Sequence, residues 1–592
     1  MQRMKRMNGI DPMFIYTETA STPMEVAYTC VFEPSTASGG YSFEGIRNLL
    51  ANRLPSLDPF RRRLVEIPLG LDHPRWVDDP DFDLDNHLHR TALPDPGGEV
   101  ELHKMAAEVM GRPLDCDQPP WEMHLIEGLD GGKIGLIAKL HHAVIDGVSG
   151  AELLAQLLDV TPDVTLKVED HSPWRPPALP SRSRLVSEAL PRLLTSPMRF
   201  VAAAREIGRS TVRLAFHAAD AGAAPLTIPL GAPAQFASPM TACRTVSFAE
   251  ANLSDVLALK ERLGVTLNDI VLAACSGAMR SYLTEHHRET HPSLVAVVPV
   301  SVRAESEQGT LGNRLSAMFV PLANDRAQPL DRLETVAAAC AAAKAQERVV
   351  GYGAMAAAVS EAVPPALAGP ALRLGAQFGA MRRLRPGNLV ISNVPGPRFP
   401  LYFAGMRMEA VYPIGPVVDG VALNITVQSY LDSLFVGLNA CPAVVPDVDS
   451  LARSVVLELT RLTEAAAGDV RAAPQKESDS KPPPPAGGGK PVRLLGPSSP
   501  RHGPGPQEHK IASAPTATER ATTRSDRQDQ QPSFSPVRSA VLAEATGGQG
   551  PTEGRIATSF CGLPRGLTDF SWDLAPVEVP GLAGRARMDH GL

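Results

Sequence analysis

His141-His142-Ala143-Val144-Ile145-Asp146-Gly147 lies between a predicted strand and a predicted helix, and the rest of the chain can be placed around it. Residues 121–140 contain two segments in which apolar and polar side chains alternate, as in half-buried strands. Asp130-Gly131-Gly132 separates these segments and predicts a hairpin turn. After the motif, Ser149 and Glu152 match a capping box that precedes a leucine-rich helical face. The motif is therefore expected in a short loop on a rigid scaffold, where chemistry is commonly located.

The size and composition of the chain indicate a multidomain globular protein. It has 592 residues, a formal net charge of -7 and a hydrophobic share of 44%. This length is enough for two or more domains with cores of their own. The mild acidity argues against nucleic-acid binding, which needs basic surface. The seven cysteines are scattered without a CxxC pair, which indicates neither a zinc site nor a disulfide framework and fits a reducing, cytoplasmic compartment.

The chain shows no pattern typical of a secretory signal or a membrane span. Basic residues near the N-terminus are not followed by an apolar segment. No apolar run reaches the roughly 18 residues that a spanning helix needs. The most apolar stretch, residues 353–381, is interrupted by prolines and charged residues. A packed helical pair is the favoured interpretation of this stretch, and a helix lying on a membrane surface is the alternative.

Changes of composition along the chain indicate two folded halves, a linker and a tail. Residues 1–160 mix strand and helix patterns and include the histidine motif. Residues 161–235 contain proline-rich pieces around a basic helical stretch, which predicts a crossover between domains. Residues 236–464 again have the patterns of a folded α/β unit. Residues 465–592 are rich in proline, glycine, serine and charge, and we expect them to be disordered because they cannot bury enough apolar surface.

The second half contains one clear helix start and several strands. Thr266 and Asp269 form a variant capping box, which places Asn268 in the first turn of a helix. Asn393-Val394-Pro395-Gly396-Pro397 predicts a sharply shaped loop. Apolar patterns predict strands at residues 294–302, 318–322, 389–392 and 423–430.

The histidine pair allows three interpretations. A metal site would need a further protein ligand, and neither an HExxH motif nor a cysteine cluster supplies one, so we expect no metal. A buried and fully hydrogen-bonded pair is the structural alternative. General-base catalysis is favoured, because the pKa of histidine lies near neutrality, Asp146 can hold the loop and Gly147 permits close backbone approach. No G-x-S-x-G elbow is present, which favours direct transfer to a hydroxyl over a serine acyl-enzyme.

The motif resembles the HHxxxDG signature of the CoA-dependent acyltransferase superfamily, which includes chloramphenicol acetyltransferase and peptide-synthetase condensation domains. Other segments, in order between about residues 4 and 463, are similar to motifs of the bacterial wax ester synthase/diacylglycerol acyltransferase family. These segments are Asn8 to Phe14, Pro23-Met24, Pro113-Leu114-Asp115 with Pro119 to Glu122, Asn268-Asp269, Pro299 to Arg303, Gly312-Asn313 and Ser392 to Pro397. Pro120 stands where the family usually has leucine. The tail is not covered by the resemblance.

The resemblance implies an α/β fold of two similar chloramphenicol-acetyltransferase-like domains with the active-site channel between them. It implies that His142 is the general base and that His141 supports it. An acceptor hydroxyl would attack the thioester of a long-chain acyl-CoA without a covalent acyl-enzyme. Because related folds pair the motif aspartate with an arginine, we expect Asp146 to be structural, with Arg61 as its partner.

The other site residues have both a functional and a structural interpretation. Asn268 either polarises the thioester carbonyl or supports the start of its helix. Pro120 and Trp121 are expected to line the acyl route, with plain core packing as the alternative for Trp121. Asn393 and Gly396 either shape the channel or form a rigid turn.

The resemblance also implies the substrates and the location. The expected function is transfer of an acyl group from acyl-CoA, a co-substrate, to diacylglycerol, giving triacylglycerol, or to a fatty alcohol, giving a wax ester. No other cofactor and no nucleic acid is expected, and the oligomeric state stays open. Lipid substrates without a membrane span imply peripheral attachment to a membrane or lipid droplet. The alternatives are a carrier-protein-dependent condensation enzyme and a non-catalytic lipid-binding family member.

Overall fold

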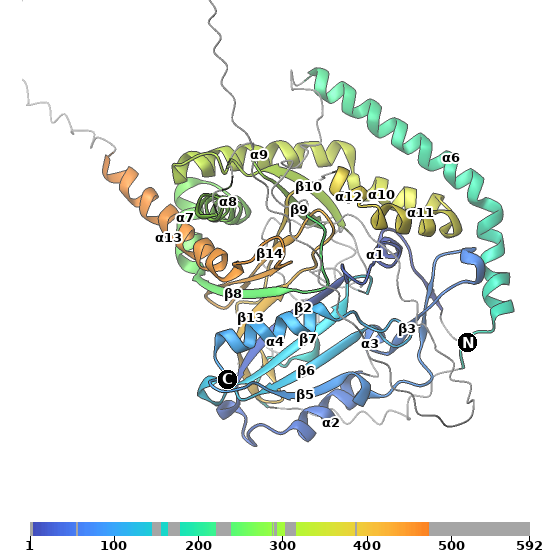
Figure 1. The fold of residues 1–592 in the computed structure, drawn as a ribbon, viewed down its shortest axis with the longest axis horizontal. Helices are drawn as coiled ribbons and strands as arrows, with labels where there is room; N and C mark the ends of the chain where they lie inside the picture. Colours follow the sequence, from blue (N-terminus) through green and yellow to red (C-terminus); the bar gives the residue numbers. More distant parts are fainter. Residues whose placement is uncertain are drawn as a thin grey trace, which may run out of the picture. The chain divides into compact units, whose positions relative to one another are not determined.

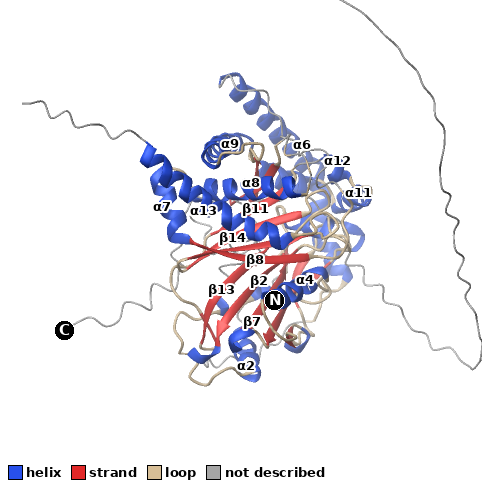
Figure 2. Cartoon of the chain, turned by 60° about the vertical axis from the view of Figure 1, so that its left-hand side comes forward, coloured by secondary structure: helices blue, strands red, loops and turns tan. Residues whose placement is uncertain are grey.

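The structure is a computed structural model of the 592-residue chain. It describes residues 4–54, 57–144, 156–163, 178–220, 238–286, 288, 290, 293–301, 315–384 and 387–472. All of these residues belong to one compact unit. Figures 1 and 2 show helices packed around two β-sheets, so the predicted α/β class is confirmed.

The first sheet has six strands in the order β12-β13-β2-β7-β6-β5. The predicted hairpin is confirmed, since β6 and β7 pair antiparallel around a turn at Asp130–Gly132. The edge strand β5 is parallel to β6. The strands span β2 (Glu25–Glu33), β5 (Leu88–Ala92), β6 (Trp121–Glu127), β7 (Ile134–His141), β12 (Tyr402–Phe403) and β13 (Met406–Ile414).

Two helices cover the two faces of this sheet. On one face, α4 (Glu99–Gly111) buries Leu102, Ala106 and Val109 against the sheet residues Ile126 and Ile137. On the other face, α2 (Phe43–Arg53) contributes apolar side chains to a second core cluster. Because alternate strand residues face opposite sides, the strands of this sheet contribute to both cores.

The second sheet also has six strands, in the order β10-β9-β11-β14-β15-β8. The strands span β8 (Thr245–Asn252), β9 (Val295–Ser301), β10 (Leu315–Pro321), β11 (Leu389–Val394), β14 (Leu423–Tyr430) and β15 (Ser433–Ala440). The helices packed with it include α7 (Leu253–Leu263), α8 (Leu267–Glu285), α9 (Pro329–Val350) and α13 (Val448–Ala472). The capping box of Thr266 and Asp269 at the start of α8 is confirmed. Helix α13 continues to Ala472, so the prediction that disorder begins at residue 465 is wrong for residues 465–472.

A strand exchange joins the two sheets. Strand β13 lies late in the sequence, yet it pairs antiparallel with β2 of the first sheet, with Arg407 opposite Glu33 and Ile414 opposite Ala27. The same strand lies against the second sheet, where a Cβ on Gly437 would overlap the carbonyl oxygen of Pro413. The close approach therefore requires glycine at position 437, and both halves of the sequence contribute to one sheet.

A small sheet and several short helices complete the N-terminal part. The small sheet has the order β1-β4-β3, formed by Lys5–Arg6, Arg75–Asp78 and Arg62–Val65. Helix α1 (Asp11–Tyr16) and the four-residue helix α3 (Asp58–Arg61) lie nearby in sequence. Single 3-10 turns occupy η1 (Pro34–Thr36), η3 (Pro68–Gly70), η4 (Leu84–Asn86) and η5 (Asp130–Gly132).

The outer helices include the predicted crossover helix. Helix α6 spans Arg182–Asp220 and confirms the helical stretch expected in the linker. The apolar stretch at residues 353–381 forms α10 (Tyr352–Ala362), α11 (Pro365–Gln377) and the start of α12 (Ala380–Leu384). None of the helices that the structure describes has the length and apolar character needed to cross a membrane.

Candidate active site

His142 directly follows strand β7 and is held by the N-terminal segment of the chain. Its backbone N–H donates a hydrogen bond to the carbonyl oxygen of Met24, with an N···O distance of 2.8 Å. Its imidazole stacks on the ring of Phe14 with a centroid distance of 4.3 Å and an interplanar angle of 9°. The residue is only 2% exposed. Phe14 of helix α1 and Met24, the residue before β2, therefore fix the ring plane and the backbone of this histidine.

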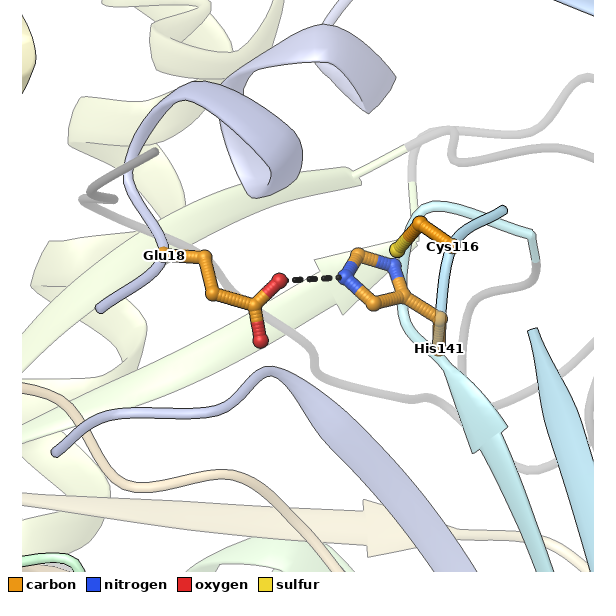
Figure 3. A group of neighbouring side chains, drawn as sticks. All are labelled: Glu18, Cys116 and His141. Carbon is orange, nitrogen blue, oxygen red and sulfur yellow. Dashed lines mark hydrogen bonds and ion pairs between the residues drawn. The ribbon is translucent and has the colours of Figure 1, made fainter. Parts of the chain in front are cut away.

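His141 is fixed by hydrogen bonds at both ring nitrogens, of which Figure 3 draws the one to Glu18. The backbone N–H of Ala143 donates to its Nδ1 at 3.0 Å, so Nδ1 is an acceptor and the ring proton lies on Nε2. Nε2 lies 3.2 Å from Oε2 of Glu18, to which it donates. Burial lowers the pKa of His141 to about 4, so the ring is neutral near pH 7. This arrangement makes His141 a structural support for the turn that carries His142.

Two groups of side chains in the described residues have potential metal-ligand atoms within 4.8 Å of one another. The first is Glu18, Cys116 and His141, of which Cys116 lies beside the imidazole in Figure 3. The hydrogen bonds of His141 to Glu18 and from Ala143 account for the position of its ring without a metal ligand bond.

The second group, His89, Glu122 and His124, lies on β5 and β6. Glu122 accepts a hydrogen bond from the buried Lys139 ammonium at 3.1 Å. Burial alone would raise the pKa of Glu122, but the neighbouring His124 and Lys139 lower it to about 2. A local ion-pair network therefore explains this group.

The segment before β6 supports the histidine pair through its backbone. The carbonyl oxygen of Pro120 accepts from the N–H of His141 at 3.0 Å. The N–H of Leu114 donates to Oε1 of the buried Glu25 at 3.0 Å. Trp121 lies in the core, where its indole N–H donates to the carbonyl oxygen of Phe60 at 2.8 Å. The described contacts of Trp121 are those of a core residue, and its expected contribution to the acyl route stays a prediction.

Arg61 lies among carboxylates of the N-terminal part. Its guanidinium forms ion pairs with Asp58 and, at 3.4 Å, with Asp78. Asp146 and Gly147 lie outside the described residues. The pairing of Arg61 with Asp146 therefore stays a prediction.

Asn268 occupies the first turn of α8, as predicted. The start of this helix is capped by Thr266 and Asp269, which exchange hydrogen bonds. Asn268 is therefore not required as the cap. Its side chain is buried, and its Nδ2 has no hydrogen-bond partner among the residues that the structure describes. A buried amide with unused donors is costly unless a ligand or water takes the hydrogen bond.

A similar buried amide lies near the end of β11, and a required glycine lies in the loop that follows. Asn393, which the sequence places in the loop, belongs to the strand. Within the described ranges, Nδ2 of Asn393 also lacks a hydrogen-bond partner, and the residue is buried. The N–H of Gly396 donates to Oγ of Ser429 at 3.1 Å. A Cβ on Gly396 would overlap the carbonyl oxygen of Ser429. The interpretation of this loop as a rigid turn thus has a direct steric basis. Of the other motif residues in the second half, Val302, Arg303, Gly312 and Asn313 lie outside the described residues.

The sequence alone did not identify several residues that hold the histidine pair. Glu18 is a single acidic residue between two recognisable motifs, and Glu25 is the first residue of a strand. No periodicity marks such residues, because their partners are distant in sequence. The roles of Phe14 and Met24 were also missed, although both lie in the motifs near the N-terminus.

Comparisons with known proteins agree with this architecture. Residues 7–271 match the wax ester synthase/diacylglycerol acyltransferase catalytic domain, and residues 311–463 match the C-terminal domain of that family. A Mycobacterium tuberculosis (strain ATCC 25618 / H37Rv) protein that carries the name diacylglycerol O-acyltransferase is 34% identical over 477 residues, covering 78% of this chain and 91% of the relative. Another from M. tuberculosis (strain CDC 1551 / Oshkosh) is 36% identical over 435 residues, covering 72% and 90%.

A solved structure has the same fold. It is the wax ester synthase/diacylglycerol acyltransferase from Marinobacter aquaeolei VT8, which is 26% identical and has a TM-score of 0.56. The comparison covers 78% of this chain and 100% of that structure. The chain belongs to the wax ester synthase/diacylglycerol acyltransferase family.

Proposed function

We propose that the protein transfers a long-chain acyl group from acyl-CoA to the hydroxyl of diacylglycerol, and also to fatty alcohols, with His142 as general base. The observation that carries this proposal is the placement of His142, whose ring lies flat on Phe14 and whose backbone is held by Met24. Family membership supports the same reaction.

In the proposed reaction, the acceptor hydroxyl gives its proton to a ring nitrogen of His142. The hydroxyl oxygen attacks the thioester carbonyl carbon, and a tetrahedral oxyanion forms. Its collapse breaks the C–S bond and releases CoA thiolate, which accepts the proton from the imidazolium and leaves as CoA thiol. A positioned general base of this kind is typically worth about 10²–10⁴-fold in rate.

Burial of His142 supports transfer to the lipid acceptor over hydrolysis. A residue that is 2% exposed meets few water molecules, so a bound alcohol competes with little water for the base. The stacked Phe14 also limits rotation of the imidazole, which keeps the acceptor nitrogen aimed in one direction. This preorganisation is the protein's contribution to the proton transfer.

Asn268 is the proposed donor to the thioester oxygen. Its Nδ2 is buried and lacks a partner in the described part of the chain, and the capping of α8 is already provided by Thr266 and Asp269. A donor that meets the developing oxyanion is typically worth about 10²–10³-fold in kcat. The proposal uses no metal and no cofactor besides the acyl-CoA co-substrate, and it forms no acyl-enzyme.

The proposal includes peripheral attachment of a cytoplasmic protein to a membrane or lipid droplet. Both proposed acceptors are lipids, and none of the helices in the described ranges could cross a bilayer. The enzyme would therefore have to meet its acceptor at a lipid surface.

The test is an assay of the purified full chain with labelled palmitoyl-CoA and either diolein or hexadecanol. We expect triacylglycerol or wax ester to form, and His142→Ala to reduce the rate by about 10²–10⁴-fold. His89→Ala, which changes a partly exposed histidine on β5, should keep the rate and serves as the control. Absence of product with both acceptors would contradict the function, and full activity of His142→Ala would contradict the mechanism.

A further inference from the structure

The large apolar side chains that the structure exposes gather in one region. Twelve of the fifteen in the described residues lie on α6, on α10 and α11, or on the segments beside them. We call this region the α6–α11 surface, and its members are Leu69, Leu179, Leu190, Leu194, Met198, Phe200, Val201, Val212, Val359, Leu367, Leu374 and Phe378. Scattered exposed apolar residues are ordinary, but a collection of this size indicates a binding surface.

Helix α6 has an apolar stripe on the side away from the protein. Leu190, Leu194, Met198 and Val201 follow one another at intervals of four, four and three residues, which places them on one helical face. Leu194 is 71% exposed and Met198 is 68% exposed. The buried apolar residues among the described side chains of this helix are Leu185, Ala189 and Ala203, and they lie on the opposite face. The stripe is therefore not the face that α6 packs on the protein.

Helix α11 repeats this arrangement. Leu367 and Leu374 are seven residues apart, so they share one exposed face of the helix, and the exposed Phe378 directly follows the helix. Gly369 on the opposite face is buried, and a Cβ there would lie 3.8 Å from the ring of Tyr16 on α1. Figure 1 shows α6, α10 and α11 at the same outer side of the molecule.

The turn η3 brings the two helices together and exposes a leucine between them. Leu185 and Ala189 of α6 pack with Ile67, just before η3. A Cβ on Gly70 would lie 3.0 Å from the backbone of Ala366 at the start of α11. Between these contacts, Leu69 is 84% exposed and has φ of 58°, which leucine rarely adopts. Packing on both sides thus holds an exposed apolar side chain in an unfavourable backbone conformation, as is common at functional sites.

The charge of α6 differs from that of the whole chain. The helix has seven arginines against two glutamates and one aspartate, whereas the chain has a formal net charge of -7. Arg205 and Arg209 are exposed beside the apolar stripe, and Arg209 also forms a solvent-exposed ion pair with Glu206 at 3.6 Å. Arg192 and Arg199 form ion pairs with Glu361 of α10, at 3.3 and 3.9 Å, which fasten the helix to the protein. An apolar stripe beside arginines is typical of a helix that lies in a bilayer interface.

The α6–α11 surface is also one layer away from His142. Leu372 of α11 and Ala357 of α10 pack against the core cluster that contains Phe14 and Ala143. Phe14 in turn stacks on His142. The helices that carry this surface therefore pack on the same core cluster that positions the base.

We propose that the α6–α11 surface docks on an anionic phospholipid membrane, with its leucines, Met198 and Phe378 in the acyl boundary and the neighbouring Arg205 and Arg209 of α6 on phosphate headgroups. This inference rests on the proposed function in that it assumes lipid acceptors. The other possible occupant is a second copy of this chain, but the excess of arginine makes self-association less favourable than binding to anionic lipid.

The test is flotation of the full chain with vesicles of phosphatidylcholine alone or with 30 mol% phosphatidylglycerol. We expect the wild type to float with the anionic vesicles. The triple variant Leu194→Asp, Met198→Asp, Leu374→Asp should lower the bound fraction at least tenfold. The matched control Val100→Asp, Leu457→Asp changes two exposed apolar residues away from this surface and should float like the wild type. Arg205→Gln, Arg209→Gln should reduce the preference for anionic vesicles.

Two further measurements separate this inference from the proposed function. Butyryl-CoA and hexanol are water-soluble, so with these substrates the triple variant should keep the wild-type rate. If the wild type floats with vesicles but turns over no substrate, the proposed function is contradicted and the docking surface is still supported. Flotation of the triple variant at the wild-type level, or equal loss by the control, would overturn the docking surface. Sedimentation measures the oligomeric state. If the wild type is a dimer and the triple variant is a monomer with unchanged flotation, the surface binds a second copy of the chain and the membrane-docking proposal is contradicted.

Discussion

The imidazole of His142 lies parallel to the ring of Phe14, with 4.3 Å between centroids and 9° between planes. Replacing Phe14 by leucine keeps an apolar side chain but removes the flat surface against which the imidazole is held. We expect kcat to fall by about 10- to 100-fold, because small displacements of a catalytic group cost rates of this order. Initial rates measured over a range of hexadecanol concentrations give kcat for the variant and the wild type. A wild-type kcat in Phe14→Leu would mean that the stacking does not orient the base.

A second prediction concerns the buried contact between His141 and Glu18. Glu18→Ala removes the acceptor of the Nε2–H proton and should destabilise the protein by about 1–3 kcal/mol, the usual cost of an unsatisfied buried donor. Glu18→Gln keeps an acceptor oxygen and should recover most of this loss. Urea unfolding of the three proteins measures both effects. Equal stability of Glu18→Ala and the wild type would show that the hydrogen bond contributes nothing measurable.

The lowered pKa of His141 predicts a dependence of stability on pH. The folded pKa is about 4 and the ordinary value is 6.5, so the unfolded chain binds an additional proton between these pH values. Stability is therefore fully present above pH 6.5 and is lost as pH falls from 6.5 towards 4, by up to about 1.4 kcal/mol per pH unit. The slope of unfolding free energy against pH should be shallower in His141→Gln. Identical slopes in this window would contradict the prediction.

The amide of Asn268 should matter for the rate more than for stability. Asn268→Ala removes a donor whose nitrogen has no partner among the described residues, so it should lower kcat by about 10²–10³-fold. The free energy of unfolding should change little, because Thr266 and Asp269 still cap α8. Kinetics and urea unfolding on the same preparation separate the two roles. A loss of stability with an unchanged kcat would favour a structural role.

Gly396 offers a steric test of the loop after β11. Gly396→Ala places a Cβ onto the carbonyl oxygen of Ser429 and should destabilise the protein by about 1–3 kcal/mol. The control is Gly208→Ala on α6, where a Cβ meets nothing within 4 Å; alanine should be neutral or stabilise the helix by about 0.5–1 kcal/mol. Thermal unfolding measures both changes. Equal melting temperatures for the two variants would mean that the loop adapts without cost.

Local patterns in the sequence were enough to predict much of this fold. The hairpin around Asp130–Gly132 and the capping box of Thr266 and Asp269 depend on neighbouring residues, and the structure contains both. The predicted helical pair at residues 353–381 is only partly packed, since Leu367 and Leu374 are exposed. Apolar composition alone does not tell a core-facing stripe from an exposed one.

The site was predictable where it coincides with a motif and not where it depends on distant pairs. The position of His142 after a strand followed from the sequence. Glu18 and His141 are 123 residues apart in the sequence, and no local pattern around either residue predicts their contact. The pairing of β13 with β2 is of the same kind, because strand partners far apart in sequence leave no local pattern.

That pairing has a consequence for how the chain is made. Among the strands that the structure describes, β13 is the partner of one edge of β2, so this edge lacks that partner while the ribosome synthesises the residues between Glu33 and Arg407. An unpaired strand edge can join the edges of other nascent chains. The first sheet should therefore complete late and slowly, as expected for long-range strand pairing. Heterologous production should consequently improve at low temperature or with additional chaperones, and residues 1–235 expressed alone should aggregate.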